Sequence, residues 1–119
     1  MKSGMPKASS DKILERLRKI CLSLPNTKET NNFGHQWFRW KEKPFCIFSG
    51  TPEEPLLSVK VPKRDQPLFL EDTRFLKTPY IGQHGWISLQ TAKAPVNWEE
   101  MTELIESSYT LAGGKRYGE

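Results

Sequence analysis

The amino-acid sequence predicts an α+β fold: a single domain in which an antiparallel β-sheet carries its helices mainly on one face. Apolar residues recur at helical spacing near both ends of the chain, over about residues 10–24 and 97–112. Between residues 33 and 61 the period changes to two, and short turns interrupt the pattern. Hairpin-like connections favour antiparallel pairing, and a single apolar stripe on each helix favours packing on one sheet face.

The first helix is expected to begin at Ser10, which can cap its N-terminus, and to end before Pro25. Residues 1–9 are small and polar, and we expect them to form a flexible N-terminal segment. The polar stretch 26–32 is interpreted as a turn. The apolar stripe of the helix consists of Ile13, Leu14, Leu17, Ile20, Cys21 and Leu24.

Strands are expected near residues 36–41, 45–48 and 56–61, followed by a short helix over 63–72 and a connection over 73–80. A further strand is expected over 86–90. The last helix, 97–112, begins with Asn97 as N-cap and has Glu100 three residues later, as in a capping box. The predicted domain therefore covers residues 10–116, and 117–119 form a C-terminal tail.

Charge is distributed unevenly along the 119 residues, although the formal net charge is only +4. Residues 1–64 hold 13 Lys and Arg against 6 Asp and Glu, whereas residues 65–119 hold 5 against 8. A surface with one basic side favours an anionic partner on that side. No apolar run has the roughly 18 residues that span a bilayer, and no signal-peptide pattern occurs, so a cytoplasmic location is expected. Cys21 and Cys46 are expected to be reduced and buried.

Sorting the predicted strand residues by side leaves one sheet face open to water or to a partner. The simplest assignment buries Phe38 and Trp40, although a slip of one residue would exchange Trp37 for Trp40. The open face then combines aromatic rings, which can stack on bases, with cations, which can neutralise phosphates. The alternative is a solvated surface whose cations discourage edge pairing. The candidate nucleic-acid-binding residues are Trp37, Arg39, Lys41, Lys43, Lys60, Lys63, Arg64 and Trp86.

His35 and His84 each stand beside glycine in predicted loops. If these loops meet at one end of the sheet, the histidines and Trp86 could form a site for a small molecule or an anionic metabolite. Surface histidines that only make hydrogen bonds are the simpler interpretation. The sequence shows no catalytic triad or nucleophile elbow, and the histidines lack the spacing of metal ligands, so neither a catalytic residue nor a cofactor is predicted.

Several short motifs together resemble the MmcQ/YjbR family over about residues 10–116. They are Leu22-Ser23-Leu24-Pro25, Phe33-Gly34-His35, Trp37-Phe38-Arg39, Lys43-Pro44-Phe45, Gly85-Trp86 and Ser108-Tyr109. The resemblance implies a YjbR/CyaY-like fold and a non-enzymatic protein with a double-wing arrangement that binds DNA. A metabolite-binding protein and a protein-interaction adaptor are the alternatives. The same resemblance suggests that the Tyr109 ring packs in the core while its hydroxyl anchors a loop.

Overall fold

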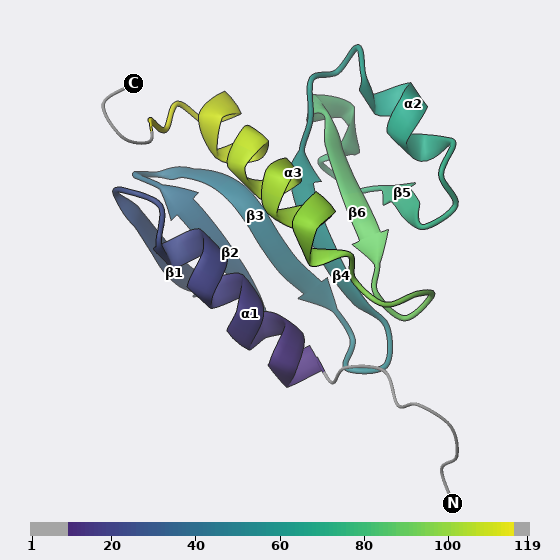
Figure 1. Cartoon of the computed structure of the whole chain (residues 1–119), viewed down its shortest axis with the longest axis horizontal. Helices are drawn as coiled ribbons and strands as arrows, with labels where there is room; N and C mark the ends of the chain where they lie inside the picture. Colours follow the sequence, from purple (N-terminus) through teal and green to yellow (C-terminus); the bar gives the residue numbers. More distant parts are fainter. Residues whose placement is uncertain (1–9, 116–119) are drawn as a thin grey trace, which may run out of the picture.

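The computed structural model of the chain describes residues 10–115 and contains a six-stranded antiparallel sheet. The expectations for residues 1–9 and 116–119 lie outside the described residues. The two long helices are α1 (Ser10–Leu22) and α3 (Trp98–Leu111), and both lie in front of the sheet in Figure 1. The remaining elements are β1 (Thr27–Asn32), β2 (His35–Trp40), β3 (Lys43–Gly50), β4 (Pro55–Lys60), α2 (Gln66–Leu70), β5 (Phe75–Lys77), the 3₁₀ turn η1 (Gly82–His84) and β6 (Trp86–Gln90).

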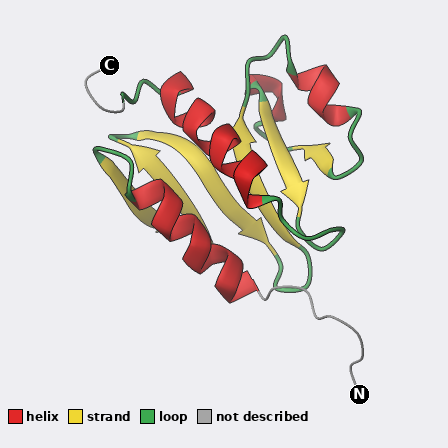
Figure 2. Cartoon of the chain, viewed as in Figure 1, coloured by secondary structure: helices red, strands yellow, loops and turns green. Residues whose placement is uncertain are grey.

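The sheet has the order β1-β2-β3-β4-β6-β5, and every neighbouring pair is antiparallel. Figure 2 shows the helices on one side of the strands, so the predicted α+β class and one-sided helix packing are confirmed. The pairing places Phe38, Cys46, Val59 and Ile87 in one row across the four central strands. All four are buried in the core that also contains Leu17 and Ile105 of the helices.

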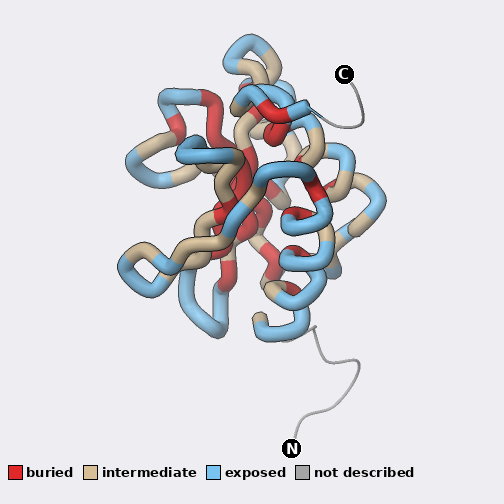
Figure 3. The backbone as a smooth tube through the Cα atoms, turned by 90° about the vertical axis from the view of Figure 1, so that its left-hand side faces the viewer, coloured by how far each residue is buried: buried red, intermediate tan, exposed pale blue. Residues whose placement is uncertain are grey.

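The core lies between the sheet and the helices, where Figure 3 shows the buried segments. The predicted burial of Phe38 is confirmed, and Trp40 is partly buried against the same core. Ile20, which belongs to the predicted apolar stripe, and Leu104 are half-buried at its margin. Cys21 and Cys46 are both buried free thiols, and burial raises the pKa of Cys21.

Two strands were not predicted. β1 occupies the stretch interpreted as a turn, and β5 lies within the stretch interpreted as a connection. β1 has the sequence Thr-Lys-Glu-Thr-Asn-Asn, and it pairs only with β2. An edge strand with so little apolar alternation has no period-two signal. β5 is three residues long, too short for a period to be read.

A β-bulge interrupts the pairing of β2 with β3. Phe38 pairs with Cys46, but Arg39 pairs with Pro44, so Phe45 is the extra residue of β3. The bulge lets both Phe45 and Cys46 enter the core. It also ends the direct pairing of β3 with β4 at Cys46 and Val59.

The hydroxyl of Ser108 on α3 bridges β3 and β4 next to the bulge. It donates to the carbonyl of Phe45 at 2.6 Å and accepts from the amide of Lys60 at 2.9 Å. Ser108 is 1% exposed, so neither backbone group has ready access to water in its place. One side chain of the helix therefore completes the hydrogen bonding of two strands.

The adjacent Tyr109 connects α3 to the end of α1. Its ring meets Phe45 edge-on, with 5.4 Å between ring centroids. Its hydroxyl donates to the carbonyl of Pro25 at 2.7 Å and lies 3.2 Å from that of Lys115. The expected role of Tyr109, a packed ring with an anchoring hydroxyl, agrees with this geometry.

The start of α3 agrees with the predicted cap in one respect and differs in another. Asn97 accepts a hydrogen bond from the amide of Glu100, as expected of an N-cap. The Glu100 carboxylate, however, does not close a capping box. It receives hydrogen bonds from Arg74, which also binds Asp72 at 2.7 Å, because Arg74 directly precedes β5 and this strand begins next to the start of the helix.

Replacing Ser108 tests the bridge between β3 and β4. Ser108→Ala leaves a buried carbonyl and a buried amide without a partner, so we expect a loss of about 1–3 kcal/mol in the free energy of unfolding. Ser107→Ala is the matched control, because Ser107 is exposed on the same helix, and it should change stability by less than about 0.5 kcal/mol. Urea denaturation measures both. Equal effects of the two substitutions would contradict the bridging role.

A second prediction concerns the ion pair that joins α1 to β1. Arg18 donates to the Glu29 carboxylate from Nε, at 2.8 and 3.0 Å, and from Nη2, at 2.9 Å, and these hydrogen bonds lower the pKa of Glu29. A carboxyl whose pKa is lower in the folded state stabilises it above the ordinary glutamate pKa of about 4.3, and this stabilisation disappears as the pH falls through the folded-state value.

Glu29→Gln should therefore cost up to about 1 kcal/mol at neutral pH, since the pair is partly exposed, and almost nothing in strong acid. Urea denaturation of both proteins at the two pH values measures this. A difference that stays constant with pH would show that the loss comes from packing rather than charge.

Candidate functional site

Basic residues gather at one end of the sheet, which we call the basic end. Antiparallel pairing brings the last residues of β2, β4 and β5 next to the first residues of β3 and β6. In Figure 1 this end comprises the turn between β2 and β3 and the segments that connect β4 to α2 and β5 to β6. Its cations are Arg39, Lys41, Lys43, Lys60, Lys63, Arg64 and Lys77, and the acids among the same segments are Glu42 and Asp65.

Trp37 lies on the sheet face away from the helices, which we call the open face. The pairing forms one row across all six strands on this face, and its members are Thr30, Trp37, Ile47, Ser58, Ser88 and Leu76. Ile47, Ser58 and Ser88 are buried although they do not belong to the helix-side core. Larger side chains of the same face must therefore cover the small central ones.

Arg39 is held against Trp37 by three contacts. Its guanidinium carbon is 5.0 Å from the centre of the Trp37 ring, its Nε donates to the Thr30 hydroxyl at 3.2 Å, and its Nη1 donates to the carbonyl of Glu42 at 3.1 Å. The indole N–H of Trp37 is buried and has no hydrogen-bond partner among the described residues. Arg39 therefore presents a fixed charge, while it covers one face of the ring that was expected to stack on bases.

Trp86 is also on the predicted side of the sheet, as the Cα partner of Lys60 and outside the helix-side core. It is, however, only 5% exposed. An indole this buried does not offer a face to a ligand. The prediction that Trp86 is exposed and available for stacking is therefore wrong. The alternation of residues along a strand predicts which sheet face a side chain lies on, but it does not predict whether other segments cover that side chain.

Lys41 differs from its expected position as well. It is in the turn after β2, with a φ of 55°, rather than in the strand. Its ammonium lies 4.8 Å from the centre of the Trp40 ring, and Trp40 packs against the helix-side core. Lys41 therefore belongs to the basic end but does not share a sheet face with Trp37. Lys43, at the start of β3, is exposed at the same end.

Lys60 and Lys63 are brought together around Gly85. The amide of Val61 donates to the carbonyl of Gly85 at 2.9 Å, and a Cβ at Gly85 would lie only 2.5 Å from the Val61 carbonyl oxygen. The same Cβ would be 3.4 Å from the Cγ of Lys63 and 3.8 Å from that of Lys60. Because Gly85 also has a φ of 96°, glycine is required for this approach of two basic segments. Arg64 is exposed beside them.

The segment between β5 and β6 completes the basic end, and we call residues 78–85 the β5–β6 loop. Gln66 is buried and donates to the carbonyls of Gly82, at 2.8 Å, and Trp86, at 3.0 Å. Lys77, which enters the loop, packs its alkyl chain against Gly82. Sequence analysis missed Lys77, since the three residues of β5 gave no strand signal.

His35 and His84 are not brought together. His35 pairs with Asn32 at the turn between β1 and β2, whereas His84 precedes β6 at the basic end. These positions are at opposite ends of the sheet, because β2 and β6 run in opposite directions through the ladder. The expected joint site of His35, His84 and Trp86 is therefore not formed.

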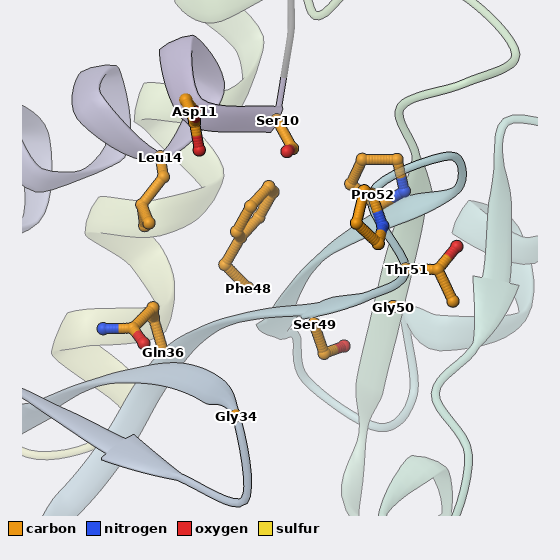
Figure 4. Close-up of a pocket in the computed structure, with 11 residues that line it drawn as sticks. Ser10, Asp11, Leu14, Gly34, Gln36, Phe48, Ser49, Gly50, Thr51 and Pro52 are labelled. Carbon is orange, nitrogen blue, oxygen red and sulfur yellow. The ribbon is translucent and has the colours of Figure 1, made fainter.

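A pocket of about 210 Å³ does occur at the end of the sheet opposite the basic one. Figure 4 shows Phe48 between Ser10 and Asp11 of α1 and the turn that follows Ser49 and Gly50, the last residues of β3. Neither histidine lines it. Its wall has no cluster of cations, so it is unsuited to an anionic metabolite.

Other site chemistry finds little support in the described part of the chain. No group of three or more His, Cys, Asp or Glu side chains in residues 10–115 could hold a metal ion. None of the described helices combines the length and apolarity needed to cross a membrane. The lysine and arginine side chains of the basic end can bind anions.

Comparison with known proteins agrees with this fold. The crystal structure of Deinococcus radiodurans protein DR2400, described as a DUF419 domain, superposes with a TM-score of 0.67 and 21% sequence identity, over 82% of this chain and 76% of that one. No curated protein matches the chain. The family model named YjbR matches residues 22–111, which include every strand of the sheet and all of α3. The chain therefore belongs to the YjbR family.

Proposed function

We propose that this protein is a non-enzymatic DNA-binding protein that holds the phosphate backbone at the basic end of its sheet. The observation that carries the proposal is the gathering of seven cations against two acids in the segments of this end. Lysine and arginine that neutralise phosphates release condensed counterions, and this release supplies most of sequence-independent DNA binding.

The opposite end of the sheet has the reverse charge. The turn between β3 and β4 carries Glu53 and Glu54, and the first turn of α3 carries Glu99 and Glu100. A molecule with one basic and one acidic end is oriented by the field of a polyanion before contact. This polarity supports binding through the basic end rather than along the whole open face.

The shape of the basic end supports the same function. Two basic projections flank the end of β4: the turn that carries Lys41 and Lys43, and the β5–β6 loop with Lys77 at its base. Lys60 and Lys63 lie between them in the sheet order. A pair of projections with cations between them suits the double-wing arrangement that the family resemblance implies.

The proposal predicts a strong dependence of DNA binding on salt. For a 20-bp duplex, the logarithm of the association constant should fall linearly with the logarithm of salt concentration, with a slope near −0.9 per neutralised phosphate. In a variant with Lys43→Gln, Lys60→Gln and Lys63→Gln, affinity should decrease and the slope should become shallower by up to about 2.7 units. Fluorescence anisotropy with labelled duplex over a salt series measures both.

A control variant with Lys12→Gln, Lys19→Gln and Lys93→Gln removes the same number of charges, from α1 and from the segment before α3. Net charge is then equal in the two variants, so only the position of the cations differs. The control should keep the wild-type slope. A slope that changes equally in both variants, or only in the control, would place the interface elsewhere, and wild-type protein without salt-dependent binding would refute the function.

A further inference from the structure

Tyr80 is 94% exposed, and among the described residues it is the one aromatic side chain of the basic end that lies almost wholly in water. Its φ is 71°, in the left-handed region that disfavours a bulky side chain. The amide of Ile81 donates to the carbonyl of Pro79 at 2.8 Å, which closes a three-residue γ-turn around Tyr80. A γ-turn with positive φ at its central residue is rare and strained. The strained backbone at Tyr80 raises the free energy of the folded state. Because the ring is exposed, packing of the ring does not offset this increase.

The β5–β6 loop that carries Tyr80 is fixed at its base. The amide of Thr78 donates to the carbonyl of Trp86 at 3.3 Å, and the Thr78 hydroxyl lies 2.8 Å from that of Ser88, which in turn lies 2.7 Å from that of Ser58. On the other side of the loop, Gln66 holds the carbonyl of Gly82. Tyr80 is therefore presented from a supported turn, and little conformational freedom is lost when its ring contacts a ligand.

The cations of the basic end surround this loop. Lys77 precedes it and packs against Gly82 within it, and Lys60 and Lys63 lie beside Gly85 at its end. Single-stranded nucleic acid is bound by this combination, in which cations follow the phosphates and an exposed aromatic ring stacks on a base. Trp86 does not supply such a ring because it is buried, and one face of the Trp37 ring is already covered by Arg39.

We infer that the basic end binds single-stranded DNA in preference to duplex, and that Tyr80 is the residue on which an unpaired base stacks. The inference rests on the proposed function, DNA binding, and specifies single-stranded DNA as the ligand. In a duplex both faces of an internal base are covered by its neighbours, so an exposed ring gains nothing there. An unpaired base has a face free for Tyr80, whatever its sequence.

Phe33 provides a matched control. It is 98% exposed, has a φ of 56°, and occupies the turn between β1 and β2 with Gly34. It therefore shares the size, exposure and backbone conformation of Tyr80. It lies at the opposite end of the sheet, on the side of the turn that carries Glu53 and Glu54, where a phosphate backbone is repelled.

The test measures affinity by fluorescence anisotropy for a dT 20-mer, an abasic 20-mer with the same phosphates and a 20-bp duplex. Wild-type protein should bind dT about 5- to 150-fold more tightly than the abasic strand, the value of one base stacked on an aromatic ring. Tyr80→Ala should lose this difference and leave abasic and duplex binding within about twofold. Tyr80→Gly, which accepts the positive φ, should behave in the same way, whereas Phe33→Ala should match wild type.

The outcomes separate the inference from the proposed function. If wild-type protein binds all three ligands with a strong salt dependence but dT no more tightly than the abasic strand, stacking is refuted and phosphate binding stands. An equal loss of dT affinity in Tyr80→Ala and Phe33→Ala also refutes the assignment. If none of the three ligands binds, both proposals are refuted. Thermal unfolding of the variants confirms that each is folded, as expected for replacement of an exposed side chain.

Discussion

The arrangement of the sheet depends on the hydroxyl of Ser108, which lies where β3 and β4 no longer pair directly. The bulge at Phe45 brings an extra aromatic side chain into the core, and it separates the carbonyl of Phe45 from the amide of Lys60. A buried backbone group without a partner costs about 1–3 kcal/mol. Ser108 satisfies both groups at once, so α3 can pack on the sheet only in the register that places this residue at the bulge.

The positions of two cations of the basic end depend on the same bulge and on the same hydrogen bonds of Ser108. Arg39 is the residue at which the pairing of β2 shifts, and Lys60 is the residue whose amide Ser108 binds. Tyr109 continues the link by holding the carbonyl of Pro25 and packing on Phe45. The Leu-Pro and Ser-Tyr motifs, which are more than 80 residues apart along the chain, thus meet in one contact. The motifs that identify the family here are explained by packing and hydrogen bonding.

The sequence predicted the fold where the apolar pattern was regular, and it failed where the pattern was absent or where burial depended on other segments. The stripes of α1 and α3 and the side of Phe38 were predicted because each has a clear period. β1 was missed because an edge strand of polar residues has no such period. Trp86 was assigned to the correct side but with the wrong exposure, since exposure is decided by segments that are distant in the sequence.

Tyr80 shows why the candidate site was only partly predictable. Nothing in Thr78-Pro79-Tyr80-Ile81 distinguishes a packed tyrosine from an exposed one, because tyrosine is intermediate between the mostly buried and the mostly exposed residue types. Its exposure arises because Gln66, Ser88 and Trp86 close the loop at its base and turn Tyr80 away from the sheet. Of the two indole rings that were expected to stack, Trp86 is buried and Trp37 carries Arg39 on one face, so Tyr80 is the most exposed aromatic side chain of the basic end among the described residues. A strained, exposed ring held by satisfied buried groups is a feature that stability alone does not explain, and such features concentrate at binding sites.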